Sequence, residues 1–139
     1  TVTREEVAAR WNAQVPADAD PATWRGGGAA DPVFEAFWTQ LAATGQGDGA
    51  AVRAPNGTLL DLRETVAAAP YDPADVAVPT LVVRGSEDPT ATRADALRLY
   101  DALDGDREYA EVGGGTHFLP VEARRGVLYD VVAGFHGRS

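Results

Sequence analysis

The first part of the chain has the apolar spacing of amphipathic helices. Thr3 and Glu6 stand three positions apart, which is the spacing of a capping box, and apolar residues recur behind them. This pattern predicts a helix from Thr3 to about Gln14. Residues 15–32 are rich in Pro, Asp, Ala and Gly and predict a loop.

A second helix is predicted to begin with Asp31 as its N-cap and Pro32 as its first helical residue. Gly45 is expected to end it. Its apolar residues recur at helical spacing and give it a strongly apolar face. They are Val33, Phe34, Phe37, Trp38 and Leu41.

The segment after Gly45 is open to two interpretations. Asn56 followed by Gly57, between two short apolar stretches, is the signal of a hairpin turn. Pro55 and residues 61–69 are equally consistent with a turn that leads into a short helix. Both alternatives stay open at this point.

The second half of the chain alternates between strand and helix patterns. The continuous apolar run over residues 78–83 predicts a buried strand of a parallel sheet, and residues 107–112 predict a second strand. A helix is predicted after each strand, the first over residues 92–105 with Thr92 as its N-cap and the second over about residues 121–135. This order predicts a βαβα unit, which is a parallel sheet with helices on its faces.

Composition limits the classes of function. The chain has 139 residues with no apolar run near the roughly 20 residues that span a bilayer, so we expect no membrane partner. Its 21 acidic and 12 basic residues give a net charge of −9, which argues against nucleic acid as a partner. Without cysteine, and with only His117 and His136, we expect neither a metal site nor a cofactor, and the redox compartment stays open.

Two predicted strands end in loops that carry residues capable of chemistry. Asp88 follows the first strand, and His117 follows the second behind the glycines at 113–115. Because the carboxyl ends of parallel strands meet at one edge of a sheet, we expect the carboxylate to orient the imidazole as in a catalytic triad. Glu87 is an alternative acid, whereas His136 at the end of the last helix is expected to be structural.

This arrangement resembles the carboxyl-terminal part of the α/β-hydrolase family. The similarity lies in residues 78–89, VPTLVVRGSEDP, and in His117, which follows Asp88 by 29 residues in a glycine-rich turn. In that family the acid follows a late strand, the histidine follows the last strand, and a final helix closes the fold. The resemblance implies Asp88 as triad acid and His117 as general base. It also implies a helical lid over residues 1–69 and the carboxyl-terminal part of the parallel-sheet core over residues 70–139.

The nucleophile of that family is missing from this sequence. The family carries a Gly-x-Ser-x-Gly elbow and an oxyanion-hole loop in its first half, and neither occurs here. The only serines are Ser86 and Ser139, and Ser86 stands two residues from the predicted acid without an elbow motif. We therefore predict a companion chain, cut from the same precursor, that supplies the nucleophile, the oxyanion donors and the rest of the sheet.

The resemblance implies hydrolysis or acyl transfer on an ester, thioester, lactone or amide in a partly apolar pocket. Phe34, Phe37, Trp38 and Phe118 are the predicted pocket residues. Epoxide hydrolase, dehalogenase or cyclase chemistry and a non-catalytic binding module are alternatives within the same fold. Thr1 offers a different enzyme class, because an amino-terminal threonine can be a nucleophile with its own α-amino group as base.

Overall fold

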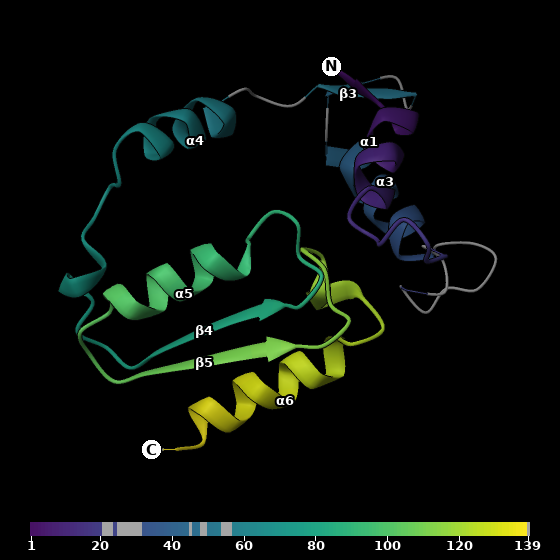
Figure 1. Cartoon of the computed structure of the whole chain (residues 1–139). Helices are drawn as coiled ribbons and strands as arrows, with labels where there is room; N and C mark the ends of the chain where they lie inside the picture. Colours follow the sequence, from purple (N-terminus) through teal and green to yellow (C-terminus); the bar gives the residue numbers. More distant parts are fainter. Residues whose placement is uncertain (21–23, 25–31, 45, 48–49, 54–56, 139) are drawn as a thin grey trace.

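The described part of the chain has a mixed α/β fold with two small sheets, one antiparallel and one parallel (Figure 1). The computed structural model describes residues 1–20, 24, 32–44, 46–47, 50–53 and 57–138. The parallel sheet lies in the C-terminal half, as the sequence predicts, and the antiparallel sheet lies in the N-terminal part.

The N-terminal part packs two helices beside the antiparallel sheet, whose strand order is β1-β3-β2. Thr3 and Glu6 form the predicted capping box, in which the backbone N–H of each donates to the side chain of the other, at 2.8 and 3.2 Å. Asp31, Gly45 and most of the predicted loop at 15–32 lie outside the described residues. The elements are β1 (Val2–Thr3), α1 (Arg4–Asn12), α3 (Pro32–Thr44), β2 (Gln46–Gly47) and β3 (Ala51–Arg53).

A cluster of buried side chains joins these elements. Trp11 of α1 and Phe34 of α3 lie with their ring centroids 5.9 Å apart, and Trp38 and Val52 complete the cluster. All four side chains belong to residues that are at most 7% exposed. Burial of a large apolar side chain contributes about 1.5–3 kcal/mol, so this cluster is the main source of cohesion in the N-terminal part.

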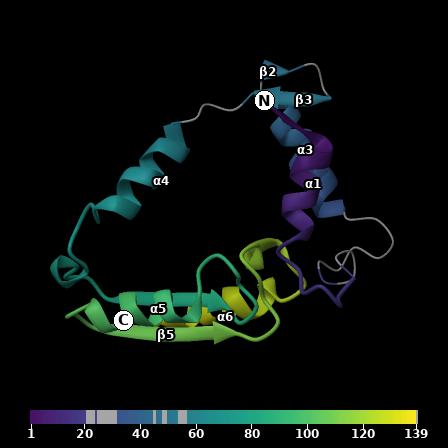
Figure 2. The same cartoon turned by 45° about the horizontal axis from the view of Figure 1, so that its top comes forward.

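The ambiguous segment after β3 contains a helix, α4 (Gly57–Ala67). The short-helix interpretation is therefore the one that the structure shows, and the residues after Gly57 do not form the second strand of a hairpin. Asn56 and Pro55 lie outside the described residues. Helix α4 lies apart from the other elements in both views (Figures 1 and 2), and its Leu62 and Val66 are exposed.

The C-terminal half forms the predicted βαβα unit. Its two strands run parallel, with Thr80 opposite Arg107 at one end and Gly85 opposite Val112 at the other. Figure 1 shows one helix on each face of this sheet, α5 on one side and α6 on the other. The elements are η1 (Pro73–Asp75), β4 (Thr80–Gly85), α5 (Arg93–Ala102), β5 (Arg107–Val112), η2 (Leu119–Val121) and α6 (Arg125–His136).

The last helix begins later than predicted. Residues 119–121 form the separate 3-10 turn η2, which contains Pro120, and α6 starts only at Arg125. Proline at the start of such a turn has its φ angle fixed and donates no hydrogen bond, which suits a short turn better than a helix interior. The delay matters for function, because it leaves residues 113–124 as a long connection between β5 and α6.

Candidate active site

The two residues predicted as acid and base contact each other beyond the carboxyl ends of β4 and β5. Nδ1 of His117 lies 3.1 Å from Oδ2 of Asp88. The Asp88 side chain is 6% exposed and the His117 side chain 44% exposed. The imidazole therefore connects a buried carboxylate to the surface, which is the arrangement that a general base needs to reach a substrate.

The second oxygen of Asp88 is held by the backbone. Oδ1 accepts hydrogen bonds from the N–H groups of Thr90 and Ala91, at 2.8 and 2.9 Å. Burial, the largest single influence, raises the pKa of the carboxyl, but the donors of Ala91 and Thr90 and the contact with His117 together lower that pKa below its usual value. Asp88 is therefore an anion at neutral pH and is fixed in place.

Two glycines let the loops after β4 and β5 touch backbone to backbone. A Cβ on Gly85 would lie 2.1 Å from the carbonyl oxygen of Gly115, and a Cβ on Gly115 would lie 2.6 Å from the side chain of Leu119. The N–H of Glu87 donates to the same carbonyl of Gly115 at 2.9 Å. Gly114 has φ +72°, a left-handed conformation that glycine adopts readily.

Ser86 joins the same two loops through its side chain. Its Oγ accepts a hydrogen bond from the N–H of Gly114 at 2.9 Å and donates one to the Glu87 carboxylate at 3.0 Å. Through these contacts Ser86 links the two loops. The other serine, Ser139, lies outside the described residues. Of the two neighbouring acids, Asp88 is the one that contacts the imidazole.

Arg84, which sequence reasoning did not select, supports the acid loop. Its residue is 6% exposed, and its guanidinium donates to the carbonyls of Ala91 and Asp88, at 3.0 and 3.1 Å. It also donates to Glu111 of β5 at 2.7 Å, and this hydrogen bond is the main reason that the pKa of Glu111 is lowered. The only available signal was a charged residue at the end of the apolar run that forms β4.

The four predicted pocket residues lie in or beside the cluster of buried side chains around Trp11 in the N-terminal part. Phe34 and Trp38 are buried within it, whereas Phe37 is 42% exposed and stacks on Trp11 with 5.2 Å between ring centroids. Phe118 also stacks on Trp11, at 4.3 Å. Phe118 directly follows the candidate base, so it connects this base to helix α1.

A cavity of about 290 Å³ lies against the Asp88–His117 pair. This volume is close to the lower end of the range for small-molecule sites, about 300 Å³. None of the four predicted pocket residues is among the residues that the structure shows lining it. The lining consists of both members of the pair and of Val83, Arg84, Gly85, Ala91, Thr116, Leu119, Pro120 and Leu128.

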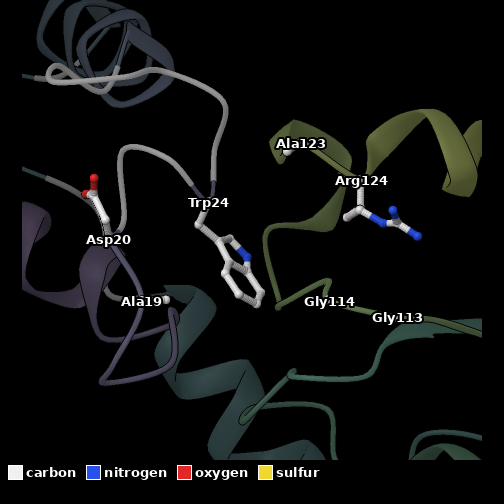
Figure 3. Close-up of a pocket in the computed structure, with 7 residues that line it drawn as sticks. All are labelled: Ala19, Asp20, Trp24, Gly113, Gly114, Ala123 and Arg124. Carbon is white, nitrogen blue, oxygen red and sulfur yellow. The ribbon is translucent and has the colours of Figure 1, made fainter.

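A second cavity, of about 560 Å³, lies between the N-terminal part and the turn after β5 (Figure 3). The Trp24 indole stands on one side, and the Gly113–Gly114 turn and Arg124 stand on the other. Ala19, Asp20 and Ala123 complete the described lining.

The remaining candidates lie elsewhere. His136 is the last residue of α6, where its ring packs edge-on against Phe135. Thr1 is exposed ahead of β1. The described part of the chain contains no group of three or more side chains suited to holding a metal ion, and none of its helices has the length and apolarity needed to cross a bilayer.

No family model, curated protein or solved structure matches this chain. The site itself is therefore the basis for inferring a function. Its central feature is a buried aspartate in contact with a half-exposed histidine, each placed just beyond one of two adjacent parallel strands.

Proposed function

We propose that this chain carries the acid and the base of a hydrolase or acyl-transfer enzyme of the α/β-hydrolase type. The observation that supports this most directly is the 3.1 Å contact between Nδ1 of His117 and Oδ2 of Asp88. Both residues follow parallel strands at the edge where α/β sheets usually place reactive groups. The proposed substrates are esters, thioesters, lactones or amides.

In the proposed reaction, Asp88 accepts a hydrogen bond from Nδ1–H of His117, which keeps the proton of the neutral ring on Nδ1 and leaves Nε2 unprotonated. Nε2 removes a proton from the nucleophile as this attacks the substrate carbonyl. The imidazolium that forms is stabilised by Asp88 and returns the proton to the leaving group. General acid–base catalysis of this kind contributes about 10²- to 10⁴-fold to the rate.

The nucleophile in this proposal comes from a companion polypeptide segment. The sequence contains no cysteine and only two serines, and Ser86 is engaged by both loops. The same segment would extend the parallel sheet, because β4 pairs with β5 alone among the described residues. An unpaired strand edge is a ready template for a further strand.

Labelling with a fluorophosphonate tests the proposal on the chain assembled with its companion segment. We expect a companion serine to be labelled, and His117→Ala to slow this labelling about 100-fold or more, because the serine loses its base. His136→Gln is the matched control and should label at the unaltered rate. If His117→Ala is labelled as fast as the unaltered protein, the assignment of His117 as general base is wrong.

A further inference from the structure

Glu122 is a buried acid that the proposed reaction does not use. Among the described residues it is 0% exposed, and its partner Thr116 is 1% exposed. Oε2 of Glu122 accepts the backbone N–H of Thr116 at 2.7 Å, and Oε1 accepts the Thr116 hydroxyl. Burying a carboxylate away from water costs several kcal/mol of folding free energy unless hydrogen bonds compensate for the lost hydration. The two contacts with Thr116 provide this compensation.

These contacts fix Thr116, the residue directly before the candidate base His117. The N–H and the hydroxyl of Thr116 donate to Glu122, and its carbonyl accepts the N–H of Leu119 at 3.1 Å. The hydroxyl also accepts the N–H of Phe118 at 3.3 Å. Every polar group of Thr116 is therefore engaged, and the peptide that leads into His117 has a defined orientation.

Glu122 is itself anchored at both ends of its backbone. Its N–H donates to the carbonyl of Leu119 at 3.2 Å. Its carbonyl accepts the backbone N–H and the guanidinium of Arg125, at 3.1 and 3.0 Å, where α6 begins. The carboxylate thus ties Thr116 to the first turn of a helix that packs on the sheet.

We propose that Glu122 is a positioning residue for His117. By holding Thr116 from the interior, it keeps Nδ1 of the imidazole on Asp88 and does not contact the reacting atoms itself. This inference rests on the proposed role of the Asp88–His117 pair. A purely structural Glu122 would affect stability but would leave the state of the His117 ring unchanged in any variant that folds.

Nitrogen NMR of the imidazole rings in the full chain separates these roles. The chain has only two histidines, so His136→Asn assigns the signals of His117. In the unaltered chain we expect neutral His117 to carry its proton on Nδ1, because the Asp88 carboxylate accepts a hydrogen bond from Nδ1–H. In Glu122→Gln we expect this preference to be lost in favour of the mixture found in free imidazoles, where the Nε2–H form predominates. Asp88→Asn should produce the same loss.

A second pair of variants tests the inference without altering the buried acid. Thr116→Val removes the hydroxyl at nearly constant volume, and we expect it to change the His117 tautomer as Glu122→Gln does. Thr116→Ser keeps the hydroxyl, so in this variant His117 should retain the Nδ1–H form. Glu87→Gln, which removes an exposed carboxylate from the neighbouring loop, should have no effect. If Glu122→Gln does not fold, the Thr116 pair decides.

The outcomes distinguish this inference from the function on which it rests. An unchanged Nδ1–H tautomer in folded Glu122→Gln or Thr116→Val overturns the positioning role and leaves the Asp88–His117 pair in place. Absence of the Nδ1–H form from the unaltered chain overturns both the pair and the positioning role.

Discussion

Asp88 uses its two carboxylate oxygens for different purposes. Oδ1 accepts the N–H groups of Thr90 and Ala91, as a turn-capping aspartate does, and Oδ2 contacts His117. In a sequence, an aspartate before a proline can be interpreted either as a turn residue or as a catalytic acid. In this loop the two roles are combined, because the turn held by Oδ1 orients Oδ2 toward His117. The local fold of the loop and the geometry of the candidate site are therefore the same feature.

The lowered pKa of Asp88 predicts how its contribution to stability depends on pH. Because the folded-state pKa lies below the value in an unfolded chain, about 3.9, the ionised carboxylate stabilises the fold at neutral pH. This stabilisation disappears as the pH falls through the folded-state pKa. We expect the difference in unfolding free energy between the unaltered chain and Asp88→Asn to shrink below about pH 4.

Urea denaturation from neutral pH to about pH 3 measures this difference. Asp104→Asn, at an exposed position on the connection between α5 and β5, is the control and should show no comparable trend. A difference for Asp88→Asn that stays constant over the whole range would contradict the expected role of the charge.

The contacts of Arg84 lead to a second prediction for a single side chain, which concerns the free energy of unfolding. Lysine keeps the charge but not the planar set of donors that reaches Ala91, Asp88 and Glu111 together. We expect Arg84→Lys to lower the unfolding free energy by about 1–3 kcal/mol, because buried carbonyls lose their donors. Arg93→Lys is the matched control, since Arg93 reaches the same Glu111 at 3.6 Å from an exposed position and should be neutral. Equal losses in both variants would argue against a special role for Arg84.

The sequence predicted the residues that stand at strand ends and missed those that hold them. Asp88 and His117 were recognisable because each follows an apolar strand pattern in a loop. Arg84 and Glu122 were not, because their importance depends on burial against hydrogen-bonding partners. For Glu122 that burial exists only once the connection after β5 has folded back to place Thr116 against it.

At the level of elements, the approach of the two loops depends on Gly85. A Cβ there would lie 2.1 Å from the backbone oxygen of Gly115, which no side-chain movement can relieve. We expect Gly85→Ala to lower the free energy of unfolding by about 1–3 kcal/mol or more, the usual effect of overpacking. The substitution should also separate Asp88 from His117. Gly113→Ala is the control, because its Cβ would meet nothing within 4 Å. Thermal unfolding and the His117 tautomer report the two effects, and equal stability of both variants would contradict this account.

Helical spacing predicted α3 but not the direction of its apolar face. The aromatic residues of this helix were expected to line a substrate pocket, whereas Phe34 and Trp38 pack with Trp11 and Val52 inside the N-terminal part. Periodicity identifies which residues share a face, and only the packing partner decides whether that face borders a ligand or a core. The segment around α4 was ambiguous for a related reason, because a turn signal describes a few residues and does not determine the element that comes after them.

At the level of the whole molecule, the parallel sheet has helices on both faces, and no described strand pairs with the edge of β4 that faces away from β5. The N–H groups of Thr80 and Ser86 donate to the chain at the two ends of β5, each at 2.9 Å. Because backbone groups alternate sides along a strand, the N–H groups of Leu81 and Val83 point away from β5. The companion segment of the proposed enzyme would find its hydrogen-bonding partners on this edge.

Amide hydrogen exchange tests whether this edge receives a strand. In the chain alone, we expect the Val82 amide, which faces β5, to be protected. The Leu81 and Val83 amides should exchange at least about 10-fold faster, because no strand among the described residues pairs with that side of β4. With the companion segment bound, all three should be protected alike. Amides in the interior of α5 serve as the control, since their hydrogen bonds lie within the helix and should not depend on the companion. Fast exchange of Leu81 and Val83 in an assembly that carries the nucleophile would mean that the nucleophile reaches His117 from a polypeptide that does not extend this sheet.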